Sequence, residues 1–119
     1  MWLEEILSWE YDRETRNCAH FTGAIWKHET GVDITLLLLP LINNACVESL
    51  RKLNEKFKRL NRLPKRRELA LAWMKSGKED NHVGVYVRGR IAHFTEAHGA
   101  MFEDPEIAML VFKQVRFYR

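Results

Sequence analysis

The sequence predicts an α+β domain in which N-terminal helices pack on a small antiparallel sheet. Apolar residues recur at three- and four-residue spacing through the first half of the chain, and short apolar runs with partial alternation follow from residue 69 onward. Helices followed by strands are typical of α+β domains rather than of alternating βα units. The length of 119 residues fits one domain, residues 1–119.

The first elements are predicted to be two helices joined by a polar connection. A short amphipathic helix is expected over residues 2–9, and the connection follows over residues 11–17. The second helix is expected over residues 18–30, because Asn17 is a favourable N-cap and Gly31 is a typical helix-ending residue.

The middle of the chain contains an apolar run and a third amphipathic pattern. Residues 36–42 contain Pro40, which leaves a buried helical turn and a packed loop equally open. A long helix is expected between an asparagine cap, Asn43 or Asn44, and Pro64. Its apolar stripe comprises Val47, Leu50, Leu53, Phe57 and Leu60.

The C-terminal half is predicted to be mostly strands. They are expected over residues 69–74, 82–87, 90–95, 100–103 and 111–118. Arg88-Gly89 is a tight-turn sequence that would join the second and third strands. Asp104-Pro105 should start a short helix that runs to about residue 109, since Asp caps helices and Pro suits the first helical position.

Cys18 is the candidate nucleophile because it occupies the first turn of its predicted helix. The unpaired N–H groups and the helix dipole there favour the thiolate, and would lower a thiol pKa that is about 8.5 when unperturbed. The alternative is that Cys18 is a small apolar residue packed beneath the helix. Cys46 is the other cysteine, and two cysteines make no disulfide framework.

His82 and His93 are the candidate base and its orienting residue. If Arg88-Gly89 is a two-residue turn, Gly84 lies opposite His93, and both histidines share one face of the hairpin as diagonal neighbours. A nucleophilic thiol needs a base, and the base needs a third group that holds its orientation. The alternative is that each histidine is an ordinary structural or solvent-facing residue.

Three short motifs together resemble the NlpC/p60 cysteine peptidases, in the compact form found among phage tail proteins. They are Asn17-Cys18-Ala19-His20-Phe21, His82-Val83-Gly84-Val85-Tyr86-Val87 and Ile91-Ala92-His93, in that order. The resemblance implies a papain-like fold with Cys18 as nucleophile, His82 as general base and then acid, and His93 as the orienting residue. It also implies oxyanion or substrate binding by the Cys18 amide with Tyr11 and Asn17.

The chain departs from the usual motif of that family. The family shows Asp before the cysteine and Ser-Gly after it, where this chain has Asn17 and Ala19-His20. This version is also similar to the lecithin retinol acyltransferase-like families, in which the histidines precede the cysteine. The order of residues here favours the peptidase branch.

The resemblance implies a cysteine endopeptidase that hydrolyses a peptidoglycan stem-peptide amide and is delivered as a phage tail component of the virion. No metal or organic cofactor is expected, since the histidines and cysteines show no paired ligand spacing. Two alternatives remain open. One is a catalytically weak or inactive structural tail-tip or assembly protein, and the other is a thiol acyltransferase or a peptidase that acts on a protein.

The charge pattern adds a basic segment over residues 51–67, in which Glu55 is the only acid, to a formal net charge of +3. We interpret this segment as the solvated face of a helix. Its alternatives are contact with an anionic wall polymer, with a partner protein of the virion, or with nucleic acid phosphates. Because no aromatic residues interleave on that face, sequence-specific nucleic-acid binding is not expected.

The N-terminus carries Glu4 and Glu5 where a secretory signal would carry bases. No apolar run approaches the length of a membrane span. We therefore expect synthesis in the cytoplasm without a signal peptide or membrane span, followed by association with the virion tail.

Overall fold

A six-stranded antiparallel sheet in the order β1-β6-β2-β3-β4-β5 organises the fold. The computed structural model describes residues 2–43, 47–57, 59–60, 69–75 and 81–119. Its strands are β1 (Arg59–Leu60), β2 (Ala70–Lys75), β3 (Asn81–Val87), β4 (Arg90–Thr95), β5 (Gly99–Glu103) and β6 (Gln114–Tyr118). Its helices are α1 (Trp2–Leu7), α2 (Cys18–Thr30), α3 (Thr35–Asn43), α4 (Val47–Lys56) and α5 (Pro105–Val111).

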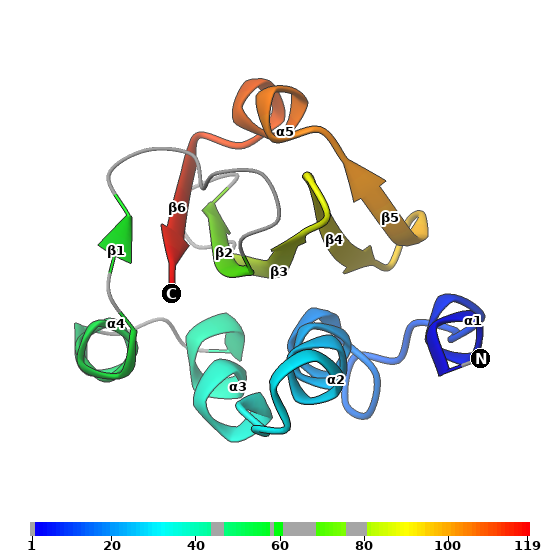
Figure 1. The fold of residues 1–119 in the computed structure, drawn as a ribbon, viewed down its shortest axis with the longest axis horizontal. Coiled ribbons are helices and arrows are strands. Elements are labelled where there is room, and N and C mark those ends of the chain that lie inside the picture. Colours follow the sequence, from blue (N-terminus) through cyan, green and yellow to red (C-terminus); the bar gives the residue numbers. More distant parts are fainter. Residues whose placement is uncertain (1, 44–46, 58, 61–68, 76–80) are drawn as a thin grey trace.

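The helices lie on both sides of the sheet. Figure 1 shows α1 to α4 on one side and α5 on the other. The predicted α+β class, with N-terminal helices on an antiparallel sheet, is therefore confirmed. Within the described part of the chain, no helix has the length and apolar character that crossing a membrane requires.

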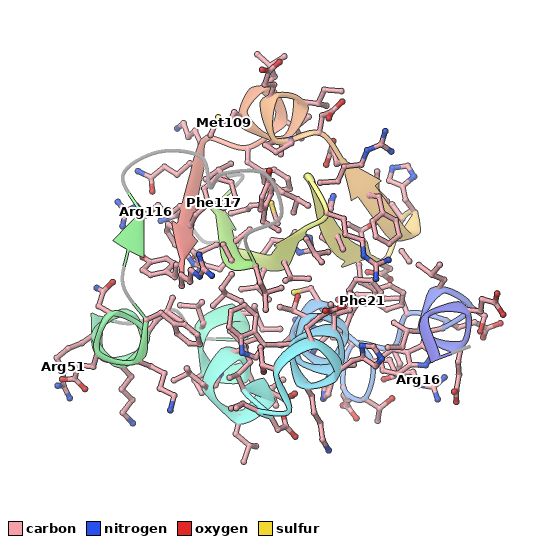
Figure 2. The ribbon with its side chains drawn as sticks, in the orientation of Figure 1. Arg16, Phe21, Arg51, Met109, Arg116 and Phe117 are labelled. Carbon is pink, nitrogen blue, oxygen red and sulfur yellow. The ribbon has the colours of Figure 1, made fainter. Side chains whose placement is uncertain are left out.

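Alternation along the central strands divides the core into two clusters. Side chains of β2, β3 and β4 that face α2 and α3 form the first cluster, which includes Leu71, Trp73, Val83, Val85, Ala92 and Phe94. The intervening side chains of these strands, together with Phe117 of β6 and Ala108 of α5, form the second cluster, which includes Ala70, Ala72, Met74, Tyr86 and Ile91. Figure 2 shows Phe21 between α2 and the sheet, where its ring stacks on Phe94 with centroids 5.1 Å apart.

Helix α2 begins and ends where the sequence predicts. The Asn17 side-chain oxygen accepts hydrogen bonds from the amides of Ala19 and His20, at 2.9 and 3.2 Å. At the other end Gly31 has φ +81° and its N–H donates to the Lys27 carbonyl at 2.7 Å. Both ends of this helix are thus fixed by local chemistry, which places Cys18 in its first turn.

The β3–β4 hairpin has the predicted register. Arg88 and Gly89 both have positive φ, as a two-residue turn of this kind requires, and Gly84 pairs with His93. The run around Pro40, for which a helical turn and a loop were both open, is helix α3, in which Leu38 and Leu41 are buried. Asp33 accepts the Thr35 amide at its start, at 2.9 Å.

The expected long helix up to Pro64 is wrong in its second half. Helix α4 ends at Lys56, and Leu60, which was assigned to the helical stripe, lies instead in β1 opposite Phe117. Sheet hydrogen bonds with the edge of β6 replace the helical bonds there, which helical periodicity alone did not reveal. Leu53 and Phe57 are buried as predicted.

Two smaller boundaries also differ from the prediction. Helix α1 ends at Leu7, and α5 continues to Val111, so that the closing strand begins at Gln114 rather than at residue 111. Of the basic segment, Arg51, Lys52 and Lys56 are exposed on α4. Residues 58 and 61–67 lie outside the described residues, as does Cys46.

Candidate active site

The structure brings the two predicted histidines into direct contact. His82 Nε2 and His93 Nδ1 are 2.9 Å apart, and the ring centroids are 5.0 Å apart at an angle of 76°. Gly84 provides the room, since a Cβ there would lie 2.7 Å from the Ala92 carbonyl oxygen and 3.0 Å from His93 Cβ. The hairpin register therefore places one imidazole where it can orient the other.

A third side chain, Glu103, extends this contact, and sequence reasoning missed it. His93 Nε2 lies 2.8 Å from Glu103 Oε2, and Glu103 stands on β5 opposite Ile91, on the His93 face. The register of β4 with β5 would have identified it. That register depends on the turn after Thr95, whose sequence does not specify a two-residue loop.

The His93 ring is buried, the His82 ring is partly exposed, and both are uncharged at neutral pH. Burial, and to a smaller extent the neighbouring His93, lower the pKa of His82 to about 3. Burial also lowers the pKa of His93, although the hydrogen bond and the charge of Glu103 oppose that shift. The Phe112 ring stacks on His82 at 5.8 Å between centroids and covers the pair.

Cys18 occupies the predicted position but its thiol is protonated. Burial raises the pKa of the Cys18 thiol to about 11, and the amides of Val83, Cys18 and Ala19 oppose that shift only in part. The expected lowering of the thiol pKa is therefore wrong. The helix amides act in the expected direction, but Cys18 is only 5% exposed and the loss of hydration of its thiol outweighs them.

The thiol and the imidazoles lie on opposite faces of the sheet. Cys18 belongs to the first cluster with Val83 and Val85, whereas His82 and His93 contact Phe112 on the face beneath α5. In the described structure no hydrogen bond joins the Cys18 thiol to His82. The thiol does bond the backbone amide of Val83, the residue after His82.

Tyr11 lies on the Cys18 side of the sheet. Its ring packs on Phe94 with centroids 5.5 Å apart, and burial followed by the Cys18 charge raises its pKa. A cavity of about 430 Å³ opens beside it, lined by Glu10, Tyr11, Asp12, Thr15 and Arg16. Because its lining carries two carboxylates and a guanidinium group, a polar ligand could bind in this cavity.

Asn17 is engaged as a helix cap. Its side-chain oxygen accepts the Ala19 and His20 amides, and its side-chain nitrogen donates to the Arg13 carbonyl at 3.0 Å. These bonds use the groups with which Asn17 would bind a substrate. In this structure the residue fixes the start of α2 and thereby the position of Cys18.

Among the described residues, no three His, Cys, Asp or Glu side chains are arranged to hold a metal ion. The nitrogens of His82 and His93 that face each other, and the carboxylate of Glu103, are occupied by their mutual hydrogen bonds. The arrangement can move a proton between three side chains. It does not present an open set of ligands.

Comparisons with known proteins add no relative to this picture. The chain matches no model of a known protein family, and a search of curated proteins finds no significant match.

Proposed function

We propose that this chain is a cysteine peptidase with a papain-like NlpC/p60 fold, which hydrolyses a peptidoglycan stem-peptide amide as a component of a phage tail. The observation that supports the proposal most is the hydrogen bond between His82 Nε2 and His93 Nδ1. It gives His82 an orienting partner and leaves its Nδ1 for a thiol proton. Cys18, in the first turn of α2, is the nucleophile of the proposal.

The proposed reaction uses the Cys18 and His82 side chains, the Cys18 backbone amide and one water molecule. His82 Nδ1 accepts the proton of the Cys18 thiol, and the thiolate attacks the carbonyl carbon of the substrate amide. The oxyanion of the resulting tetrahedral intermediate accepts a hydrogen bond from the backbone N–H of Cys18. The leaving amine takes the proton from His82, which leaves an acyl-enzyme. A water molecule that gives its proton to His82 then hydrolyses the thioester and restores the thiol.

This reaction requires the thiol and the His82 ring to meet. A thiol with a pKa of about 11 does not transfer its proton to an imidazole with a pKa of about 3. The proposal therefore includes a movement of His82 toward the α2 face on substrate binding. His82 lies beyond Gly84–His93, the last pair of the β3–β4 register, so its ring is at the open end of that hairpin.

The second candidate is a tail-tip or assembly protein that uses the fold for docking and has weak or no activity. The buried, protonated Cys18 thiol favours this candidate, as does its separation from His82. In that case the histidine pair and Glu103 are a satisfied polar cluster within the core.

The experiment that tests the proposal is mass spectrometry of peptidoglycan incubated with the wild-type chain, with Cys18→Ala, and with Cys46→Ala as the matched control. New stem-peptide fragments that disappear only with Cys18→Ala would support the peptidase and identify the bond. Unchanged peptidoglycan with a folded wild-type chain would favour the structural candidate. A protein acylated or cleaved under the same conditions would instead indicate a thiol acyltransferase or a protein-directed peptidase.

A further inference from the structure

Three polar side chains on three neighbouring strands form a continuous hydrogen-bonded chain. His82 on β3 contacts His93 on β4 at 2.9 Å, and His93 contacts Glu103 on β5 at 2.8 Å. The His93 side chain is 3% exposed and the Glu103 side chain 14% exposed. Water therefore has little access to these bonds, and each polar atom in them depends on its protein partner.

The position of each proton in this row of hydrogen bonds follows from the Glu103 carboxylate at its end. An ionised carboxylate only accepts hydrogen bonds, so His93 Nε2 must carry a proton and donate it to Glu103. A neutral imidazole has one N–H, so His93 Nδ1 is then an acceptor. His82 Nε2 must donate to it, and His82 Nδ1 is left without a proton.

We infer that Glu103 is a positioning residue that sets the tautomers of both histidines and thereby makes His82 Nδ1 the proton-accepting atom. The inference about the tautomers stands on the three side chains alone. Its role in catalysis rests on the proposed cysteine peptidase. Glu103 touches neither the thiol nor the scissile bond and acts through His93 and His82.

The three hydrogen-bonded side chains also determine where the positive charge lies when His82 takes up a proton. When a proton binds His82 Nδ1, the Nε2 proton can pass to His93 Nδ1, and the positive charge then lies 2.8 Å from the Glu103 carboxylate. No atom beyond the three side chains is needed. A histidine pair without Glu103 would hold this charge in an apolar site without compensation.

Replacement of Glu103 by glutamine should disturb the tautomers while keeping the shape of the side chain. The glutamine amide can accept from His93 Nε2–H or donate to an unprotonated Nε2, so that both tautomers of His93 become compatible with the site. In the second tautomer His93 Nδ1 donates to His82 Nε2, and the His82 proton moves to Nδ1. The base nitrogen of His82 is then blocked.

The test is nitrogen NMR of the imidazoles in the full chain at neutral pH. The expected result for the wild type is an unprotonated His82 Nδ1 and a protonated His93 Nε2. In Glu103→Gln, His82 Nδ1 should become protonated in a substantial part of the molecules, whereas Glu103→Asp should retain the wild-type pattern. Glu106→Gln, an exposed change on α5, is the matched control and should alter neither ring.

Two results would overturn the inference. One is a proton on His82 Nδ1 in the wild type, and the other is a folded Glu103→Gln variant with unchanged tautomers. Because the spectra need no substrate, an inactive wild-type chain with the expected tautomers would refute the peptidase and leave the positioning role of Glu103 standing. In an active chain, Glu103→Gln should lower kcat about tenfold or more with little change in KM.

Discussion

The two faces of the central sheet differ in how their polar side chains are surrounded. Beneath α2 the Cys18 thiol lies in an apolar cluster, and its pKa is raised to about 11 by burial. Beneath α5 the polar groups of His82, His93 and Glu103 are linked to one another by hydrogen bonds. The α2 face holds the thiol in its neutral form beside backbone amides, whereas the α5 face holds three side chains that form hydrogen bonds with one another.

This difference shows that the alternation of side chains along a strand limits which residues can meet in one active site. Val83 and Val85 face the helices, so His82 and Gly84, which alternate with them along β3, face away. A cysteine carried by a helix that packs on the valine face is thereby on the other side of the strand from the histidines. The alternation that joins His82 to His93 is the same alternation that separates His82 from Cys18.

The largest expected effect comes from the aromatic stack beneath α2. Phe94→Ala should lower the free energy of unfolding by about 3–5 kcal/mol, because it removes the ring that packs on Phe21 and Tyr11 and leaves a cavity. Urea denaturation measures this change. Leu110→Ala on α5, where the side chain is 87% exposed, should stay within about 0.5 kcal/mol. Equal losses at the two sites would contradict the assignment of the main core to the α2 face.

The histidine pair should make the folded chain sensitive to acid. The pKa of His82 is about 3 in the fold against an ordinary value of 6.5, so this contribution to stability is complete above pH 6.5 and is lost as the pH falls toward 3. The free energy of unfolding should fall by up to about 1.4 kcal/mol per pH unit in that range from this group. Urea denaturation between pH 7.5 and pH 5 measures the slope.

His82→Phe is the matched variant for that slope, since a phenyl ring keeps the aromatic surface that stacks on Phe112. The variant should show a smaller loss of stability between pH 7.5 and pH 5 than the wild type. An identical slope in the two proteins would show that His82 is not held neutral by burial.

Gly84→Ala should have an intermediate effect on the α5 face. The added methyl group would meet the Ala92 carbonyl oxygen at 2.7 Å, and a strand backbone cannot move away without disturbing the β3–β4 pairing. We expect a loss of about 1–3 kcal/mol in the free energy of unfolding, together with changed imidazole signals of His93. Full stability with unchanged signals would show that the two strands are less closely apposed than described.

The smallest expected effect is at the start of α2. Asn17→Ala removes the acceptor for the Ala19 and His20 amides and should cost about 1 kcal/mol of stability. Asn17→Asp retains an acceptor and should cost less. Thermal unfolding measures both variants. If Asn17→Asp were as destabilised as Asn17→Ala, the side-chain cap would not be what stabilises the start of α2 at Cys18.

Local chemistry made much of the fold predictable. The Asn17 cap, the Gly31 stop and the Arg88-Gly89 turn each determine a few residues of backbone, and the hairpin turn also determines which residues face each other. The contact between His82 and His93 follows from that register. The α+β class of the fold follows from the order of the sequence patterns, in which helical periodicity comes first and strand-like apolar runs follow.

What the sequence did not reveal depends on packing between distant segments. Leu60 continues a helical stripe in the sequence, yet its backbone pairs with β6, more than 50 residues further along the chain. Glu103 joins the histidines through the β4–β5 register, which no short turn signal specifies. The thiol pKa was predicted from the helix terminus alone, whereas burial against Val83 and its neighbours determines its direction.

The central claim is that in the free protein the Cys18 thiol is buried, protonated and not paired with His82. The pH dependence of Cys18 alkylation by iodoacetamide tests this claim most directly. Cys46→Ala removes the other thiol, so that the measured rate belongs to Cys18. We predict a slow reaction at pH 7 whose rate keeps rising through pH 10, since the thiol pKa is about 11. A fast rate that is already constant below pH 8, and falls in His82→Phe, would contradict this account and indicate a thiolate paired with His82.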